Sequence, residues 1–226
     1  MTFPLGQTKD SIQDKRSGRL IFLSHCLLNQ NACVRGLASQ PAVIRELVDL
    51  LLKYEVAMYQ MPCPEVTYLG SMRWGMVKKM YSTPMFRRHC RHLAEQLCDQ
   101  VQTYRDNGHQ VIGFVMRDGS PTCGLRCAAV EADGAQVWGG MVWHANPLQC
   151  FAPTPGVFTE ELLAEWQGRG WVDPPLLTLP EVEEAGSIPD ALATIERAIV
   201  RAIVDDLPPT PEERLLAVPS LGGPRP

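Results

Sequence analysis

The sequence lacks a long apolar run. The first such run, Leu20 to Leu23, follows the polar residues 1–17 and is far too short for a secretory signal. No stretch approaches the roughly 18–20 apolar residues that a membrane span needs. We therefore expect a cytoplasmic protein with no membrane partner. In that reducing compartment, eight cysteines favour bound metal or thiol reactivity over disulfides.

A surplus of basic residues is missing as well. The formal net charge is −4 over 226 residues, whereas binding to nucleic-acid phosphates requires clustered Lys and Arg. The one dense basic segment, Arg87 to His92, falls in a helical pattern and is typical of a solvated helix face. We therefore expect no nucleic-acid polymer as a partner.

What is present is a regular alternation of short apolar runs and amphipathic segments. The pattern predicts strands over residues 19–24, 55–61, 110–116 and 176–179, and helices over 41–54, 84–107, 157–168 and 188–207. Thr159 and Ser187 are candidate N-caps, and Gly108 is a candidate C-terminal cap. Strands that alternate with helices predict an α/β fold, in a three-layer Rossmann-like arrangement around a mostly parallel sheet.

The length of the chain suits one large domain, which we place over residues 18–206. Residues 1–17 are expected to form a flexible arm. Residues 207–226 are rich in Pro and Gly and are expected to form a tail without a core of its own.

Three cysteines follow three of the predicted strands. Cys26 comes directly after the first strand, Cys63 after the second and Cys123 after the third. The carboxyl ends of parallel strands meet at one edge of a sheet, where ligands bind in such folds. Three thiols that are distant in the sequence should therefore converge there. Converging thiols suit soft metals such as zinc, copper(I) or iron–sulfur clusters.

The kind of metal site is narrowed by the absence of a CxxC pair. A structural zinc site needs four ligands, often as close pairs, whereas an iron–sulfur cluster with three protein ligands keeps one iron open as a Lewis acid. Buried cysteines also serve as small apolar side chains, so packing is the alternative for each of the three. Among the other five, Cys90 and Cys98 suit helix packing, Cys33 and Cys127 are spare ligands or redox partners, and Cys150 has no assigned role.

The segments around these cysteines resemble a known family. His25 to Asn31 (HCLLNQN), Cys63 to Gly75 (CPEVTYLGSMRWG) and Asp118 to Gly124 (DGSPTCG) are similar to the thiouracil desulfidase (TudS) family, and most similar to a related branch described as desulfidases. The resemblance is carried by residues 24–124. It implies a [4Fe-4S] cluster on the three strand-end cysteines and an enzyme that removes sulfur hydrolytically, a hydrolase or lyase, from a thiolated nucleobase such as 2-thiouracil.

The resemblance also implies catalytic roles for Glu65 and Ser120. Glu65 would act as general base on a water, and Ser120 would orient that water or donate a hydrogen bond to the developing anion. From the residues alone, a carboxylate after a strand also caps the next helix, and a serine before a proline also forms a turn. Both alternatives stay open at this point.

Two segments depart from the family pattern, and we expect them to line the pocket. Asn29 to Arg35 replaces a segment that begins with Gly and continues to Cys-Arg-Tyr, and Thr67 to Trp74 replaces Gly-Gly-Leu and Pro-Arg-Pro. Aromatic side chains there would stack on a planar base, and an arginine would pair with an anionic group; ordinary surface or core placement is the alternative for each. The candidate substrate-binding residues are His25, Asn29, Tyr68, Arg73 and Trp74.

Three rival functions fit the same residues. The protein would be a cluster-based sulfur transferase or carrier, a non-enzymatic metal-binding α/β module, or a thiol-redox enzyme, which the lack of CxxC disfavours. The sequence does not separate hydrolysis from sulfur transfer, nor a monomer from a homodimer.

Overall fold

A computed structural model describes most of the predicted domain. The described residues are 15–126, 128–129, 136–138, 141–143, 151–172, 175–181 and 186–204. The predicted tail, residues 1–14 of the predicted arm, Cys127 and Cys150 lie outside them. Within these ranges, no helix is both long enough and apolar enough to cross a membrane.

A four-stranded parallel sheet lies at the centre of the molecule. Its strands are β1 (Arg19–Leu23), β2 (Ala57–Gln60), β3 (Gln110–Asp118) and β8 (Leu176–Pro180), in the spatial order β2-β1-β3-β8. Every neighbouring pair is parallel. The chain runs outward from β1 to β2 and then returns to the other side of β1, so the strand order reverses between β1 and β3. In doubly wound sheets, ligands bind beyond the carboxyl ends of the strands at this switch point.

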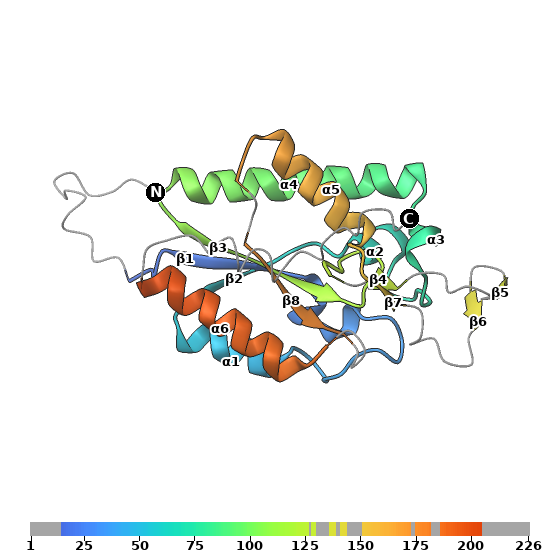
Figure 1. Cartoon of the computed structure of the whole chain (residues 1–226), viewed down its shortest axis with the longest axis horizontal. Coiled ribbons are helices and arrows are strands. Elements are labelled where there is room, and N and C mark those ends of the chain that lie inside the picture. The colour runs from blue at the N-terminus through green and yellow to red at the C-terminus, as the bar shows by residue number, and fades with distance from the viewer. Residues whose placement is uncertain are drawn as a thin grey trace, which may run out of the picture.

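Two pairs of helices cover the two faces of the sheet (Figure 1). On one face lie α4 (Pro84–Asp106) and α5 (Val157–Gly168), and on the other lie α1 (Arg45–Lys53) and α6 (Ile188–Val204). Each helix pair closes a separate apolar core against the sheet. The protein is therefore a single three-layer α/β domain, as the alternation of strands and helices predicts.

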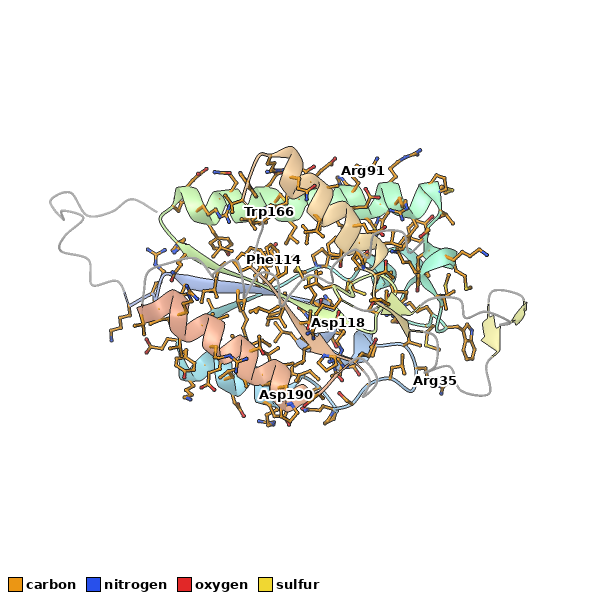
Figure 2. All side chains as sticks on the ribbon, in the orientation of Figure 1. Arg35, Arg91, Phe114, Asp118, Trp166 and Asp190 are labelled. Carbon is orange, nitrogen blue, oxygen red and sulfur yellow. The ribbon has the colours of Figure 1, made fainter. Side chains whose placement is uncertain are left out.

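Aromatic side chains fill the core between the sheet and the α4–α5 layer. The Phe22 and Phe114 rings stack with their centroids 5.1 Å apart, and Trp166 of α5 meets Phe114 edge-on at 5.6 Å (Figure 2). The neighbours of these strand residues, Ile21 and Val115, belong to the core on the opposite face. The continuous apolar runs of β1 and β3 arise because both of their faces are buried.

Several element boundaries differ from the prediction. The helix predicted from residue 41 begins at Arg45, because the backbone N–H of Ile44 bonds Leu27 and the Gln40 side chain accepts the N–H of Arg45. The predicted cap Thr159 lies inside α5, which begins after Gly156, so that prediction is wrong. The predicted cap Ser187 is confirmed, since its hydroxyl accepts the N–H of Asp190.

Short elements that the pattern did not predict occupy the strand ends. They are the 3-10 turns η2 (His25–Leu27) and η3 (Gln30–Ala32) after β1, and the helices α2 (Pro64–Leu69) and α3 (Lys78–Tyr81) after β2. Two small antiparallel pairs follow β3: β4 (Ala128–Ala129) with β7 (Phe151–Ala152), and β5 (Gln136–Trp138) with β6 (Met141–Trp143).

Candidate functional site

The segments that carry Cys26, Cys63 and Cys123 are joined by hydrogen bonds beyond the carboxyl ends of β1, β2 and β3. The ring Nδ1 of His25 lies 3.1 Å from the carbonyl oxygen of Met61, which connects the first two segments. The hydroxyl of Thr122 donates to Glu65 at 2.7 Å, which connects the second and third segments. The predicted convergence of the three strand ends at one edge is therefore confirmed.

The loop that carries Cys123 is ordered around the buried carboxylate of Asp118 (Figure 2). Its Oδ1 accepts the backbone N–H groups of Leu125 and Arg126, both at 2.8 Å, and its Oδ2 accepts Nε of Arg126 at 3.0 Å. Inside the loop, the hydroxyl of Ser120 accepts the N–H of Cys123 at 3.1 Å. These bonds hold the backbone of the loop at Cys123.

The start of α5 presses on the same loop. A Cβ placed on Gly156 would lie 2.3 Å from the carbonyl oxygen of Thr122, so only glycine fits at this close approach. The N–H of Gly156 donates to the carbonyl of Gly124 at 2.7 Å, and that of Phe158 donates to Thr122. The first turn of α5 thus holds the cysteine loop in place from behind.

Glu65 lies at the centre of a buried hydrogen-bond network. The residue is 4% exposed. Its Oε2 accepts Nε of Arg73 at 2.6 Å, and its Oε1 accepts the hydroxyl of Thr122 at 2.7 Å and that of Ser120 at 3.5 Å. The hydroxyl of Tyr81 also faces this carboxylate, which raises the pKa of Tyr81. The two residues that we predicted as catalytic, Glu65 and Ser120, are therefore brought together.

Burial sets the protonation of the cysteines nearest Glu65. It raises the pKa of the Cys63 thiol to about 11, and the neighbouring Glu65 charge adds to the effect. Burial also raises the pKa of Cys123 well above its usual range, with further contributions from Cys63 and Glu65. These two thiols are therefore protonated at neutral pH, and binding a metal would release their protons.

Cys26 lies beside a second group of residues at the same edge. A hydrogen bond with Cys33 raises the pKa of Cys26 and lowers that of Cys33, so Cys33 ionises first. Arg117 and Glu181 act electrostatically on both thiols. Cys33 therefore lies beside Cys26, and its predicted role as a spare ligand or redox partner stays a prediction.

The chemistry of the donors at this edge fits a soft metal or an iron–sulfur cluster, because thiols are the ligands that such groups prefer. Among the described residues, no three His, Cys, Asp or Glu side chains form a group that could hold one metal ion.

The residues that we predicted to bind substrate have mixed surroundings. His25 and Asn29 are engaged in their own loop: His25 lies against Met61, and the Asn29 side chain accepts the N–H of Asn31. Tyr68 packs edge-on against Phe86 and is 40% exposed, and Trp74 is 63% exposed. Trp74 and Tyr68 are thus available to a ligand, whereas His25 and Asn29 shape the loop.

Arg73, the fifth of these residues, belongs to the Glu65 network. Besides its ion pair with Glu65, its Nη2 donates to the carbonyl of Ala32 at 2.8 Å. It therefore connects the segment after Cys63 to the segment after Cys26. A guanidinium so placed positions the carboxylate, in addition to any contact with an anionic ligand.

Sequence reasoning missed four residues of the site. Thr122 lies in the DGSPTCG segment but received no role, and Arg117 lies just past the predicted end of its strand. Tyr81 and Glu181 fall in segments that carry no motif. Burial and the nearby Glu65 raise the pKa of Tyr81, and burial raises that of Glu181 to about 7. The sequence offered one signal for these four residues: Arg117 is a charged residue at the end of an apolar strand.

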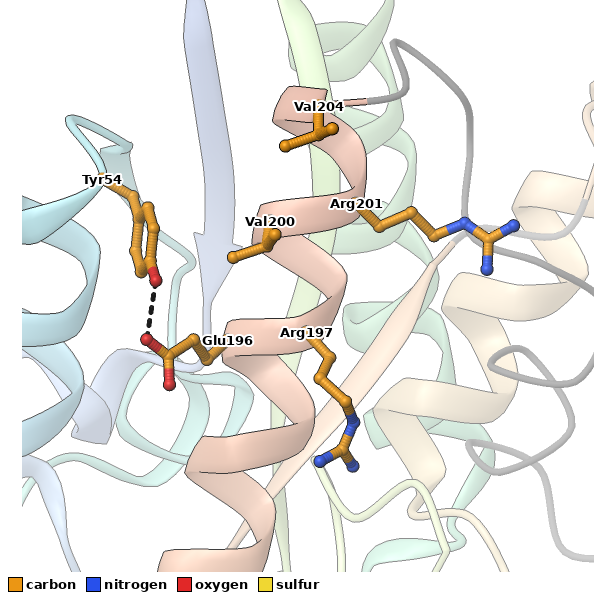
Figure 3. A pocket seen from close by; sticks show the side chains of 6 residues that line it. All are labelled: Tyr54, Glu196, Arg197, Val200, Arg201 and Val204. Atoms are coloured by element: carbon orange, nitrogen blue, oxygen red, sulfur yellow. Dashed lines mark hydrogen bonds between the residues drawn. The ribbon is translucent and has the colours of Figure 1, made fainter.

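A shallow cavity of about 390 Å³ lies elsewhere, between the last turns of α1 and α6 (Figure 3). Tyr54 donates to Glu196 at 2.7 Å across it. The side chain of Gln110, the first residue of β3, bonds the carbonyl of Ala202 in the last turns of α6, which places the cavity at the amino edge of the sheet. It contains none of the predicted site residues.

The fold and the site define an α/β protein with cysteines at the carboxyl edge of a parallel sheet. The chain is 36% identical over 107 residues to the uncharacterized protein MJ0003 of Methanocaldococcus jannaschii, a match that spans 47% of this chain and 68% of that protein. The chain belongs to the same family as that protein. No family model and no solved structure matches this chain.

Proposed function

We propose that the protein is a [4Fe-4S]-dependent desulfidase, which removes sulfur hydrolytically from a small thiolated substrate such as a thio-nucleobase in the cytoplasm. Cys26, Cys63 and Cys123 would hold the cluster. When bound, the cluster supplies an open iron that takes up the substrate sulfur as a Lewis acid. The proposal also draws on the resemblance of the three cysteine segments to the thiouracil desulfidase family.

The observation that carries the proposal is the buried Glu65 network between two of the candidate ligands. A carboxylate fixed by Arg73 and Thr122 suits a base that positions and deprotonates a water. If the cysteines only packed in the core, a buried carboxylate beside them would serve no purpose. It would also be a burden on stability, because a buried charge is costly unless it is paired and hydrogen-bonded.

The residues of the chain would divide the hydrolysis between them. Glu65 accepts a proton from the water, whose oxygen attacks the thiocarbonyl carbon. The carbon–sulfur bond breaks, hydrosulfide leaves and the carbonyl product forms, so no electrons are exchanged. Thr122 and Ser120 hold one oxygen of the carboxylate through their hydroxyls, and Arg73 holds the other. Tyr68 and Trp74, which are exposed, would cover a planar ring.

The variant Glu65→Gln tests this assignment. Glutamine keeps the size of the side chain but cannot accept the proton, so turnover should fall about a hundredfold or more. Because Glu65 is not a candidate ligand, the visible spectrum and the iron content should match those of the wild type. Glu95→Gln, which changes an exposed carboxylate on α4, is the matched control and should keep full activity.

Two results would contradict the assignment. Turnover of Glu65→Gln at the wild-type rate would mean that another group acts as base. Sulfide that forms only when an acceptor is added would favour the rival sulfur transferase, whereas free hydrosulfide without an acceptor supports the hydrolase.

A further inference from the structure

Arg117 is a buried cation without a hydrogen-bond partner. It is the penultimate residue of β3, is 1% exposed, and is among the largest fully buried side chains of the described chain. All three of its guanidinium nitrogens are buried and make no hydrogen bond to the described residues. Buried polar groups that lack hydrogen bonds are costly, so this arrangement indicates an anion that binds from outside.

Two other buried charges at this edge have partners: Glu65 is paired with Arg73, and Asp118 is paired with Arg126. Glu181 acts on Arg117 only electrostatically. Arg117 therefore stands apart from both ion pairs.

A second free donor faces the same region. Nη1 of Arg73 is buried and has no hydrogen bond. Arg73 and Arg117 both act electrostatically on Cys33 and Glu181, which indicates that the two guanidiniums lie in the same region. The N–H of Glu181 donates to the carbonyl of Asp118 at 2.7 Å, which places Glu181 beside the residue that follows Arg117 in β3.

The geometry of a guanidinium favours an oxyanion as the missing partner. Its N–H groups form a planar fork that matches the two oxygens of a carboxylate, whereas a thiolate offers one soft acceptor. The thiols of Cys26 and Cys33 come close enough to respond to Arg117 but leave all of its nitrogens unbonded. The site also lies beside the switch point of the sheet, where ligands of this architecture bind.

We propose that Arg117, assisted by the free Nη1 of Arg73, forms a subsite for an oxyanion, and that the substrate is a thiolated heterocycle that carries a carboxylate. The part that concerns the thiolated substrate rests on the function proposed above. The oxyanion subsite itself does not depend on it. Among thio-nucleobases, this distinguishes a carboxylated ring from a neutral one such as 2-thiouracil.

The test uses two probes that differ by one carboxylate, uracil and orotate (uracil-6-carboxylate). Binding is measured by calorimetry on anaerobically purified protein, so turnover is not needed. Orotate should bind the wild type about tenfold or more tightly than uracil, because charge-assisted hydrogen bonds are the strong ones. Arg117→Met should abolish this preference, and Arg117→Lys, which keeps the charge without the fork, should retain part of it.

Two further variants sharpen the test. Arg88→Met removes an exposed arginine of α4 and should leave the preference unchanged. Glu181→Gln removes the carboxylate that competes for Arg117 and should tighten orotate binding. Without a ligand, the melting temperature of Arg117→Met should equal or exceed that of the wild type, because the buried unpaired charge is gone.

Three outcomes would contradict the oxyanion subsite. They are equal affinity of the wild type for both probes, no binding of either probe, and an unchanged preference for orotate in Arg117→Met. A marked drop in the melting temperature of Arg117→Met would show a permanent internal partner instead. Iron analysis of the same samples separates the two proposals: iron-free protein that still prefers orotate contradicts the cluster alone, and iron-loaded protein without a preference contradicts the subsite alone.

Discussion

The chemical properties of the two carboxylates Glu65 and Glu181, at the carboxyl edge of the sheet, depend on the residues around them. Glu65 is surrounded by an arginine and two hydroxyls, whereas Glu181 has burial as its main influence and Arg117 as a weaker, opposing one. Two carboxylates of the same type at one edge of the sheet are thus prepared for different tasks. Because burial and Arg117 act on the pKa of Glu181 in opposite directions, its titration reports on the charges of the site.

Glu181 should make the stability of the protein depend on pH. Burial raises its pKa from the ordinary 4.5 to about 7, so the folded state holds this proton more tightly than the unfolded state. The resulting stabilisation is complete below about pH 4.5 and is lost as the pH rises through about 7. At about 1.4 kcal/mol per pKa unit, the loss is at most about 3 kcal/mol.

Urea denaturation at pH 5 and pH 8, on the wild type and on Glu181→Gln, measures this effect. The wild type should lose more stability than the variant between the two pH values, since glutamine does not titrate. Identical losses in the two proteins would show that the Glu181 carboxyl is not buried as described.

Two elements, the cysteine loop after β3 and the first turn of α5, must be considered together. The loop is held from inside by Asp118 and Ser120, and from outside by the backbone of α5 at Gly156. Neither contact is visible in the sequence pattern. The helix therefore does more than cover the sheet, because its start holds the backbone on both sides of Cys123.

Replacement of Gly156 by alanine should disturb this loop. The new Cβ would lie 2.3 Å from the carbonyl oxygen of Thr122, and such overpacking costs about 1–3 kcal/mol of stability. The displaced loop should also lower the iron content of the purified protein. Thermal unfolding and iron analysis of the variant check both effects.

Gly168, the last residue of α5, provides the matched control. A Cβ there meets nothing within 4 Å, so Gly168→Ala should leave both the melting temperature and the iron content at or above their wild-type values. If the two alanine variants behave alike, the contact between Gly156 and the loop is not what holds Cys123.

At the scale of the whole molecule, the strand order brings the site together. The order β2-β1-β3-β8 places the ends of β1, β2 and β3 side by side, so residues separated by a hundred positions share one edge. This much could be predicted from the sequence, because apolar runs with both faces buried identify parallel strands, and the cysteines directly follow them. The three-layer fold follows from the same alternation.

The finer features could not be predicted, for identifiable physical reasons. The bond between Thr122 and Glu65 joins residues 57 positions apart, and it depends on side-chain directions that no periodicity encodes. Arg117 escaped notice because β3 runs two residues beyond its apolar run, to Asp118. The start of α1 was misplaced because tertiary hydrogen bonds to Ile44 and Arg45 outweigh the local helical pattern that begins at Pro41.

The central claim, a cluster on Cys26, Cys63 and Cys123, is tested most directly by the iron and acid-labile sulfide content of anaerobically purified protein, together with its visible spectrum. The wild type should carry about four irons and four sulfides per chain with a broad band near about 400 nm. Cys123→Ser should lose or alter both, and Cys98→Ala, which changes a buried cysteine of α4, should keep them. Wild-type protein with no iron, or with zinc in its place, would contradict the cluster and leave a parallel α/β domain whose cysteines serve another purpose.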